Sequence, residues 1–373
     1  MLAAFAGPGG HAMSTQTAKR HDWVDIAKGI SIILVVMMHA TFGVGEATQQ
    51  VGFMHYVLAF ASPFRMPEFF LISGLFLGLV IARPWRRYAD RRIVHYLYFY
   101  ALWAVILILF KHLIVDRDPA GTVSLLASAV YEPYSILWFI YALAVFSLIA
   151  KLLYQFRVPH IVAFLAAAAL AIAPISTPVS ILNYTAHYFV YFYAGYAFAP
   201  HIFRFAEGVK TRKGVATAAL LAWALLNTGL VFLPGHAVTY GAIVTGVAHI
   251  PGAMFVLALA GAMAVCAAAV LVSDLRTMGW LRWIGAHSIV IYLSFVIPMG
   301  VFRTLLLAVM PNIDAGIASL ATLIVAVVSP VILYWIIGKI GFGKFLFERP
   351  AWAHLPGAPG SRWGTAPKPV PAE

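Results

Sequence analysis

Ten long apolar stretches, joined by short charged loops, constrain the fold of this chain more than any other feature. Charged residues make up 10% of the 373 residues, whereas about a quarter of a soluble domain is charged. The apolar runs are continuous and lack the alternation of a membrane β-barrel, so we expect bilayer-spanning α-helices. They lie near residues 30–45, 54–82, 95–114, 135–154, 160–174, 183–203, 214–233, 249–272, 284–309 and 315–338. The expected fold class is an all-α, polytopic integral membrane protein.

The distribution of Lys and Arg over the loops predicts the topology. Alternate loops, which would share one side of the membrane, carry 21 of the 25 cations, and the other four are Arg65, Lys111, Arg117 and Arg303. Because cytoplasmic loops retain positive charge, we expect about ten transmembrane helices with both termini in the cytoplasm. The net charge of +12 therefore reflects membrane topology. It indicates a lipid bilayer and no nucleic acid as partner.

The two ends of the chain contain little that a core could bury. We expect disordered tails at residues 1–20 and, in the cytoplasm, at residues 349–373, which are rich in Pro, Gly and Ala. The intervening residues 21–348 are expected to form one transmembrane domain. The first residues lack the basic region of a cleaved signal peptide. The single cysteine, Cys266, allows neither an internal disulfide nor a cysteine-based metal cluster, and we expect no metal site.

An ionisable residue lies in the middle of the first apolar stretch. The segment His21 to Ala40 places His39 eleven positions after Lys28. At about 100° per residue the two side chains share one helix face, roughly 16 Å apart along the axis. With Lys28 at the membrane edge, His39 lies near the middle of a hydrocarbon layer of about 30 Å. Such a residue is a functional candidate by default, and the alternative is a structural histidine bonded to a carbonyl of a neighbouring helix.

The second apolar stretch is too long for one straight span and contains Pro63 and Pro67. Proline removes a backbone donor and disfavours helix in the residue before it, so we expect a bend or an unwound turn. Arg65 and Glu68 fall at this break, roughly 26 Å and roughly 21 Å from the cytoplasmic edge. They either pair to seal a helix end or act in catalysis at a depth close to that of His39.

Five arginines crowd the loop after this stretch, namely Arg83, Arg86, Arg87, Arg91 and Arg92. Such clusters usually orient a membrane protein and bind lipid headgroups. Arginine also binds phosphate through two parallel hydrogen bonds. The loop is therefore a candidate docking site for a phosphate-rich cytoplasmic cofactor.

Two later stretches add aromatic and polar candidates. Trp138 ends the aromatic run that begins at Tyr131, and such residues either anchor the protein at the interface or stack on sugars. Tyr292 and Ser294 lie within about 15 Å of the start of the ninth stretch, close in depth to His39. With Arg65, these three residues are our candidates for substrate binding.

Four motifs in this order resemble one known family. D-x-x-K-G-I-x-I-I-L-V-V-x-x-H ends at His39, and F-R-M-P-x-F-F-L-I-S-G-L-F begins at Phe64. The fourth stretch contains L-W-F-I-Y-A-L, and the ninth contains G-A-H-S-I-V-I-Y. Together they resemble the bacterial membrane-bound acyltransferase family 3. The resemblance implies a ten-helix enzyme of the bacterial inner membrane that acylates sugars, often on exported or envelope polysaccharides.

The same resemblance implies roles for individual residues. A basic residue followed by an essential histidine corresponds here to Lys28 and His39, and the lysine resembles the branch of fucose O-acetylases and glucan modifiers. Two features depart from the family pattern. A histidine often found after the I-Y of the ninth stretch is replaced by Leu293–Phe295, and the R-x-x-R that enters the third stretch reads Arg92-Ile-Val-His95, although Arg83-Pro-Trp-Arg86 stands upstream.

The implied reaction is the transfer of an acyl group, expected to be acetyl, from acyl-CoA to a carbohydrate or glycolipid hydroxyl. O-acyl transfer needs a base, which His39 can supply, or an acyl carrier, which His39 can equally be. Glu68 is the second catalytic candidate. Lys28 and the arginine loop would hold the phosphates of acyl-CoA, a co-substrate in a protein with no permanently bound cofactor.

A proton-coupled transporter is the main alternative. It would also explain His39, Arg65 and Glu68 inside the membrane beside a proline-broken helix. Transporters often have corresponding broken segments in two halves of the chain, and no such pair is visible here. A non-enzymatic sensor or assembly factor has no positive indication, and the sequence does not predict an oligomeric state.

Overall fold

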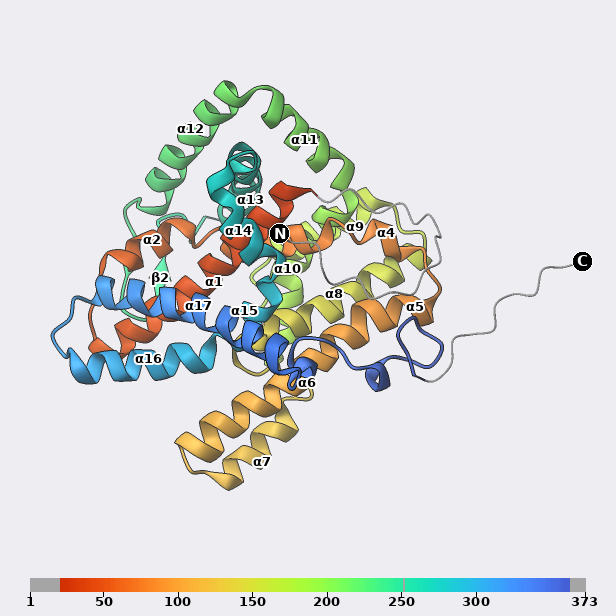
Figure 1. Ribbon diagram of the computed structural model, residues 1–373. Helices are drawn as coiled ribbons and strands as arrows, with labels where there is room; N and C mark the ends of the chain where they lie inside the picture. The colour runs from red at the N-terminus through yellow and green to blue at the C-terminus, as the bar shows by residue number, and fades with distance from the viewer. Residues whose placement is uncertain (1–20, 251, 363–373) are drawn as a thin grey trace, which may run out of the picture.

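Helices form most of the described chain, as the apolar stretches predict (Figure 1). The computed structural model describes residues 21–250 and 252–362. The tail expected at residues 1–20 lies outside them. Within the described chain, the only strands are β1 (Ala237–Val238) and β2 (Ile243–Val244), a short antiparallel pair. The all-α fold class is therefore confirmed.

The N-terminal half contains one continuous helix followed by a broken one. Helix α1 (Asp22–Thr48) is unbroken. The second stretch divides into α2 (Phe53–Ala61), α3 (Arg65–Gly74) and α4 (Gly78–Ile81). The sequence predicted a bend or an unwound turn at Pro63 and Pro67, and the helix is indeed interrupted there, because α2 ends two residues before Pro63 and α3 begins two residues after it. The second interruption, between α3 and α4, was not predicted.

The remaining helices follow in chain order, and the label η marks short π-helical or 3₁₀-helical segments. The third stretch comprises α5 (Trp85–Ala89), η1 (Asp90–Val94), α6 (His95–Ile108) and η2 (Leu109–Val115). Next come α7 (Pro119–Ser128), η3 (Ser135–Leu137), α8 (Trp138–Gln155), α9 (His160–Ile172), α10 (Ser180–Ala197), α11 (Ala199–Thr211) and α12 (Lys213–Val231). The last are α13 (Ala253–Val272), η4 (Arg276–Met278), α14 (Gly279–Ala286), α15 (Ser288–Ser294), α16 (Val296–Val309), α17 (Ala315–Ile340), η5 (Lys344–Leu346) and η6 (Ala351–Ala353).

The described residues contain six helical segments long and apolar enough to cross a bilayer. A seventh results if α15 and α16, which are bent by 56° to one another, count as one span. Helix α9, in the fifth predicted stretch, is a shorter apolar helix. The protein is thus a helical membrane protein, whereas the count of ten and the cytoplasmic termini stay predictions.

Helix α1 occupies the centre of the fold, where it contacts α14, α17, α3 and α13 (Figure 1). Small residues permit the closest of these approaches. The main chain at Gly285 of α14 lies against the carbonyl of Asp25, and Gly29 of α1 lies against Leu281. A side chain at either glycine would overlap the opposite helix, and small residues at crossings are typical of helix packing in membranes. This packing brings α14 and α15 beside Lys28.

A second close crossing joins α3 to α10. Gly74 of α3 lies against the main chain of Phe192, and Gly195 of α10 lies against the main chain of Leu71. The two backbones therefore approach without intervening side chains. As a result, the aromatic side chains near the start of α10 reach the helix that begins at Arg65.

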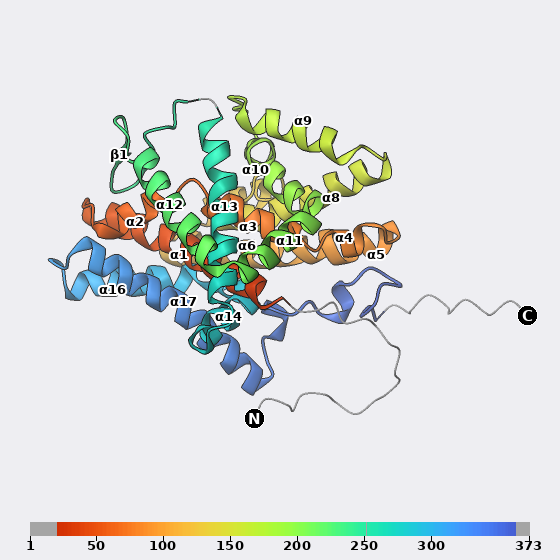
Figure 2. The same cartoon turned by 90° about the horizontal axis from the view of Figure 1, so that it is seen from above.

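The segment after α17 turns back along α5 and α6, as both views show (Figures 1 and 2). Tyr98 donates a 3.0 Å hydrogen bond to the carbonyl of Phe345, and the Trp103 indole donates one of 3.0 Å to Leu346. Farther along, the Arg349 side chain pairs with Asp90 at 2.5 Å. The disordered tail expected from residue 349 is therefore corrected for residues 349–362, because buried polar contacts hold them. Residues 363–373 lie outside the described chain.

Candidate functional site

His39 faces an internal cavity of about 170 Å³. Its ring is half-buried and packs obliquely against Phe295, with ring centroids 5.5 Å apart. Within residues 21–250 and 252–362, no hydrogen bond or ion pair engages the imidazole. The alternative of a structural histidine bonded to a neighbouring helix is therefore not what the structure shows. The ring nitrogens are available to a molecule in the cavity.

Aromatic side chains form one wall of this cavity. Trp138, predicted as a substrate-binding residue, stacks on Tyr184 of α10 with ring centroids 4.3 Å apart and an interplanar angle of 28°. Tyr188, one helical turn farther along α10, lies 5.4 Å from the same indole. All three residues line the cavity with His39. The wall therefore presents broad ring surfaces beside a free imidazole.

Arg65 lines the same cavity from the first turn of α3. It does not pair with Glu68, because no ion pair joins these two residues among the described part of the chain. The break after α2 explains the position of Arg65. Because α2 ends at Ala61, a new helix, α3, begins at Arg65, and this residue lines the cavity beside His39. Arg65 is the one cationic side chain that the described residues place in this cavity.

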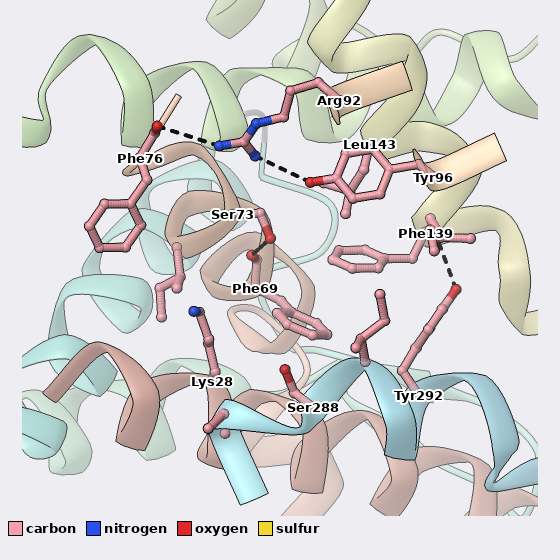
Figure 3. Close-up of a pocket in the computed structure, with 15 residues that line it drawn as sticks. Lys28, Phe69, Ser73, Phe76, Arg92, Tyr96, Phe139, Leu143, Ser288 and Tyr292 are labelled. Atoms are coloured by element: carbon pink, nitrogen blue, oxygen red, sulfur yellow. Dashed lines mark hydrogen bonds between the residues drawn. The ribbon is translucent and has the colours of Figure 1, made fainter. Parts of the chain in front are cut away.

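Lys28 lines a second cavity of about 360 Å³ (Figure 3). Its ammonium group lies 3.7 Å from the Asp25 carboxylate and points into the space between α1, α3 and α15. Across the cavity, the Arg92 guanidinium donates to the carbonyl of Phe76 at 3.4 Å and to the hydroxyl of Tyr96 at 3.2 Å. Ser288 contributes a hydroxyl at the start of α15. Two predicted donor-binding residues, Lys28 and Arg92, thus share one cavity.

A third and larger cavity of about 840 Å³ collects most of the arginine loop. We call it the arginine basin. Its cationic lining consists of Arg83, Arg87, Arg91, Arg92 and Arg349, and it also contains Asp90, His95 and His354. A buried lysine holds the loop in place, because Lys151 donates to the carbonyls of Ile81 and Arg83 at 2.6 and 2.9 Å. The arginine loop therefore has a fixed position and lines a cavity with four of its arginines.

The three cavities lie in series. The arginine basin and the Lys28 cavity share the lining residues Arg92, Tyr96 and Ile289. The Lys28 and His39 cavities share three rings, those of Phe69, Phe139 and Tyr292. Two of these rings, on Phe69 and Phe139, stack at 4.5 Å. Aromatic side chains thus form the boundary between the two inner cavities, and the arginine basin lies at the opposite end of the series from His39.

A family model described as an acyltransferase domain matches residues 21–338, most of the chain. The chain belongs to the acyltransferase 3 family. No curated protein and no solved structure matches it. The family resemblance of the four sequence motifs is confirmed, and the protein is a membrane acyltransferase.

Three predicted residues lie apart from the cavities of this acyltransferase. Glu68 is fully buried and accepts a hydrogen bond from Ser31 of α1, about 12 Å along the helix from His39. Ser294 donates to the carbonyl of Val290 at 2.8 Å. Arg86 is exposed and does not line the arginine basin. The structure therefore brings neither Glu68 nor Ser294 to the imidazole.

Tyr292 reaches the site through its ring. Its hydroxyl donates to the carbonyl of Ile136 at 2.5 Å and accepts from the Ile140 amide at 3.4 Å. Because the hydroxyl both donates and accepts a hydrogen bond within the protein, only the Tyr292 ring is left to contact a bound molecule, and it lies at the boundary between the two inner cavities.

Several lining residues escaped prediction. Tyr184 and Tyr188 are four positions apart in α10, a spacing that places them on one helix face, and this signal was available. Arg349 and His354 gave no signal, because they lie after the last apolar stretch in a segment of low complexity. Their place in the arginine basin follows only from the fold of the segment after α17.

Proposed function

We propose that this acyltransferase transfers an acyl group, with acetyl as the expected one, from acyl-CoA to a hydroxyl of a carbohydrate or glycolipid of the bacterial envelope. We further propose the inner membrane as its location. The observation that carries the proposal is the series of three cavities, with the arginine basin at one end and, at the other, a histidine that has no hydrogen-bond partner among the described residues.

The shape and charge of the series match the parts of acyl-CoA. The nucleotide end of this donor carries several phosphates, and a flexible, narrow arm leads from it to the thioester. The arginine basin is the largest and most cationic of the three cavities, and guanidinium groups bind phosphate in a bidentate manner. The Lys28 cavity has a smaller volume, about 360 Å³, and suits the arm. This arrangement would deliver the thioester toward the rings of Phe69 and Phe139.

The His39 cavity suits a sugar hydroxyl as acceptor. Trp138, Tyr184 and Tyr188 offer ring faces on which a sugar can stack, while Arg65 offers hydrogen-bond donors. Both kinds of group surround His39, which itself lacks a protein partner among the described residues. An acceptor hydroxyl in this cavity would therefore meet a base without displacing an existing contact.

In the direct version of the reaction, His39 accepts the proton of the acceptor hydroxyl while its oxygen attacks the thioester carbonyl carbon. The carbon–sulfur bond then breaks, and the departing thiolate takes the proton from the imidazolium. The products are an ester and free coenzyme A. In the two-step version, a His39 nitrogen attacks the thioester carbonyl carbon, the carbon–sulfur bond breaks, and the departing thiolate takes the proton of the imidazole, which leaves free coenzyme A and an acyl-imidazole. The acceptor oxygen then attacks the acyl carbon, the carbon–nitrogen bond breaks, and the hydroxyl proton returns to the imidazole.

Purified protein in lipid nanodiscs, supplied with radiolabelled acetyl-CoA and candidate envelope glycans, tests the proposal. We expect label on an acceptor with the wild type and none with His39→Ala. Label trapped on the wild-type protein without acceptor distinguishes the two-step version from direct transfer. Robust acylation by His39→Ala would overturn both versions of the mechanism, whereas the absence of label on every acceptor with the wild type would contradict the proposed donor and acceptor.

A further inference from the structure

The segment that follows α17 lies beyond the family match, which ends at residue 338, yet it forms part of the arginine basin. We call residues 341–362 the C-terminal strap. Rings and main-chain hydrogen bonds fasten its first part to α6, including the contact of Phe347 with Trp103 at 5.8 Å. The strap is therefore a fixed wall of the basin at this end.

The second part of the strap closes around one carboxylate, that of Asp90 in η1. Arg349 donates from one nitrogen to the Asp90 side chain at 2.5 Å and from the other to its carbonyl at 2.7 Å. The amide of Leu355 donates to the second carboxylate oxygen at 2.7 Å, and His354 Nδ1 lies 3.1 Å from the first. The side chains of Arg349 and Asp90 are only 4% and 6% exposed.

The position of Asp90 raises an electrostatic problem. It lines the same basin as Arg83, Arg87, Arg91 and Arg92, where an uncompensated carboxylate would repel a phosphate. Within the described chain, only the strap supplies a cation to this carboxylate. A buried ion pair adds little net stability compared with a well-packed apolar pair, so stability alone does not account for its presence beside a cavity.

We propose that the C-terminal strap masks the charge of Asp90, and that Arg349 is thereby a positioning residue which keeps the arginine basin selective for the phosphate-bearing donor. This inference rests on the proposed acyl-CoA donor. Arg349 acts through Asp90: it cancels the one negative charge of the basin, and the four loop arginines remain to bind phosphate.

Binding of coenzyme A to the full chain in nanodiscs tests the proposal. Arg349→Gln should weaken the affinity about tenfold, because Asp90 is then uncompensated. The double variant Asp90→Asn with Arg349→Gln removes both charges, and it should bind within about threefold of the wild type. Arg349→Lys should retain most of the affinity. Arg204→Gln, at an exposed arginine on α11, is the matched control and should leave the affinity unchanged.

The outcomes separate this inference from the proposed function. A wild-type protein that does not bind coenzyme A overturns the proposed donor and this inference with it. Two outcomes overturn only the masking role, provided that the wild type binds coenzyme A. In the first, Arg349→Gln binds as well as the wild type. In the second, the double variant binds as weakly as Arg349→Gln. If Arg349→Gln fails to fold, the single variant Asp90→Asn tests the masking role. Masking predicts that Asp90→Asn binds coenzyme A at least as tightly as the wild type, and weaker binding contradicts it.

Discussion

Two polar sites on helix α1, eight residues apart, differ in whether the protein itself supplies a hydrogen-bond partner. The Ser31 hydroxyl hydrogen is shared between the carbonyl of Ala27, at 2.8 Å, and one carboxyl oxygen of Glu68, and both side chains are fully buried. The other carboxyl oxygen of Glu68, Oε1, has no partner among the described residues. His39 has no such partner among the described residues and opens onto a cavity. Both sites would count as functional by the presence of a polar residue inside the membrane. A partner within the protein distinguishes them, because Ser31 and Glu68 contact one another in the core, whereas the His39 ring faces a cavity.

The distinction has a physical basis. A buried polar group costs free energy unless it is hydrogen-bonded, so a satisfied group stabilises the fold, whereas an unsatisfied one needs another reason to be there. His55 provides a matched comparison of the same residue type. It is fully buried, accepts from the amide of Gly52 at 3.1 Å and lies 3.3 Å from the carbonyl of Tyr240. The structure thus contains one histidine with both ring nitrogens near main-chain partners and one with no partner among the described residues.

The largest expected effect concerns these two histidines. His39→Ala should lower the acyl-transfer rate by about two to four decades, the range for a positioned base, and leave the melting temperature nearly unchanged. His55→Ala should lower the melting temperature and leave the rate per folded molecule within a few-fold of the wild type. Thermal melts and single-turnover assays measure both. Loss of stability in His39→Ala with partial activity would erase the contrast.

A smaller effect is expected at the aromatic wall. Trp138→Ala removes a ring face on which an acceptor sugar can stack, and it should raise the KM for the acceptor about tenfold, within the range for one stacking contact. The KM for acyl-CoA should stay unchanged. Tyr131→Ala, in the same aromatic run but 65% exposed, serves as the control. Equal effects of the two substitutions would indicate membrane anchoring instead.

Lys28 should have a milder influence. Its ammonium group already lies near Asp25, so Lys28→Ala should raise the KM for acyl-CoA a few-fold and reduce the maximal rate little. Lys28→Arg should retain much of the activity, since a cation stays in the cavity. Steady-state kinetics with varied donor concentration provide the measurement, with Lys210→Ala on α11 as control. A selective change in the KM for the acceptor would contradict the assigned orientation of the cavities.

The smallest effect on catalysis is expected at the buried Ser31–Glu68 pair. Glu68→Gln keeps an acceptor for the Ser31 hydroxyl, so activity should stay within about threefold and stability should not fall. Ser31→Ala removes the donor and should cost about 1 kcal/mol of unfolding free energy. Chemical denaturation and turnover assays of the two variants test this. A hundredfold loss of activity in Glu68→Gln at unchanged stability would make Glu68 catalytic after all.

The sequence by itself predicted the features that depend on local periodicity and backbone chemistry. Apolar stretches of membrane length required helices, and the prolines at 63 and 67 required the break before Arg65. Helical spacing placed Lys28 and His39 on one face of α1, and the structure shows that they line two adjacent cavities. Each of these features is encoded within about a dozen consecutive residues.

Only the tertiary structure decided which polar groups meet across helices. The depths of Glu68 and His39 along their helices suggested that the two side chains approach one another. Depth does not determine how a helix is rotated about its own axis, and this rotation decides which way a side chain points. The crossings at Gly285 and Gly74 set those rotations, and they turn Glu68 toward Ser31. The strap is a second case, because Asp90 and Arg349 are 259 residues apart. Such a pairing depends on the path of the whole chain, which no local pattern encodes.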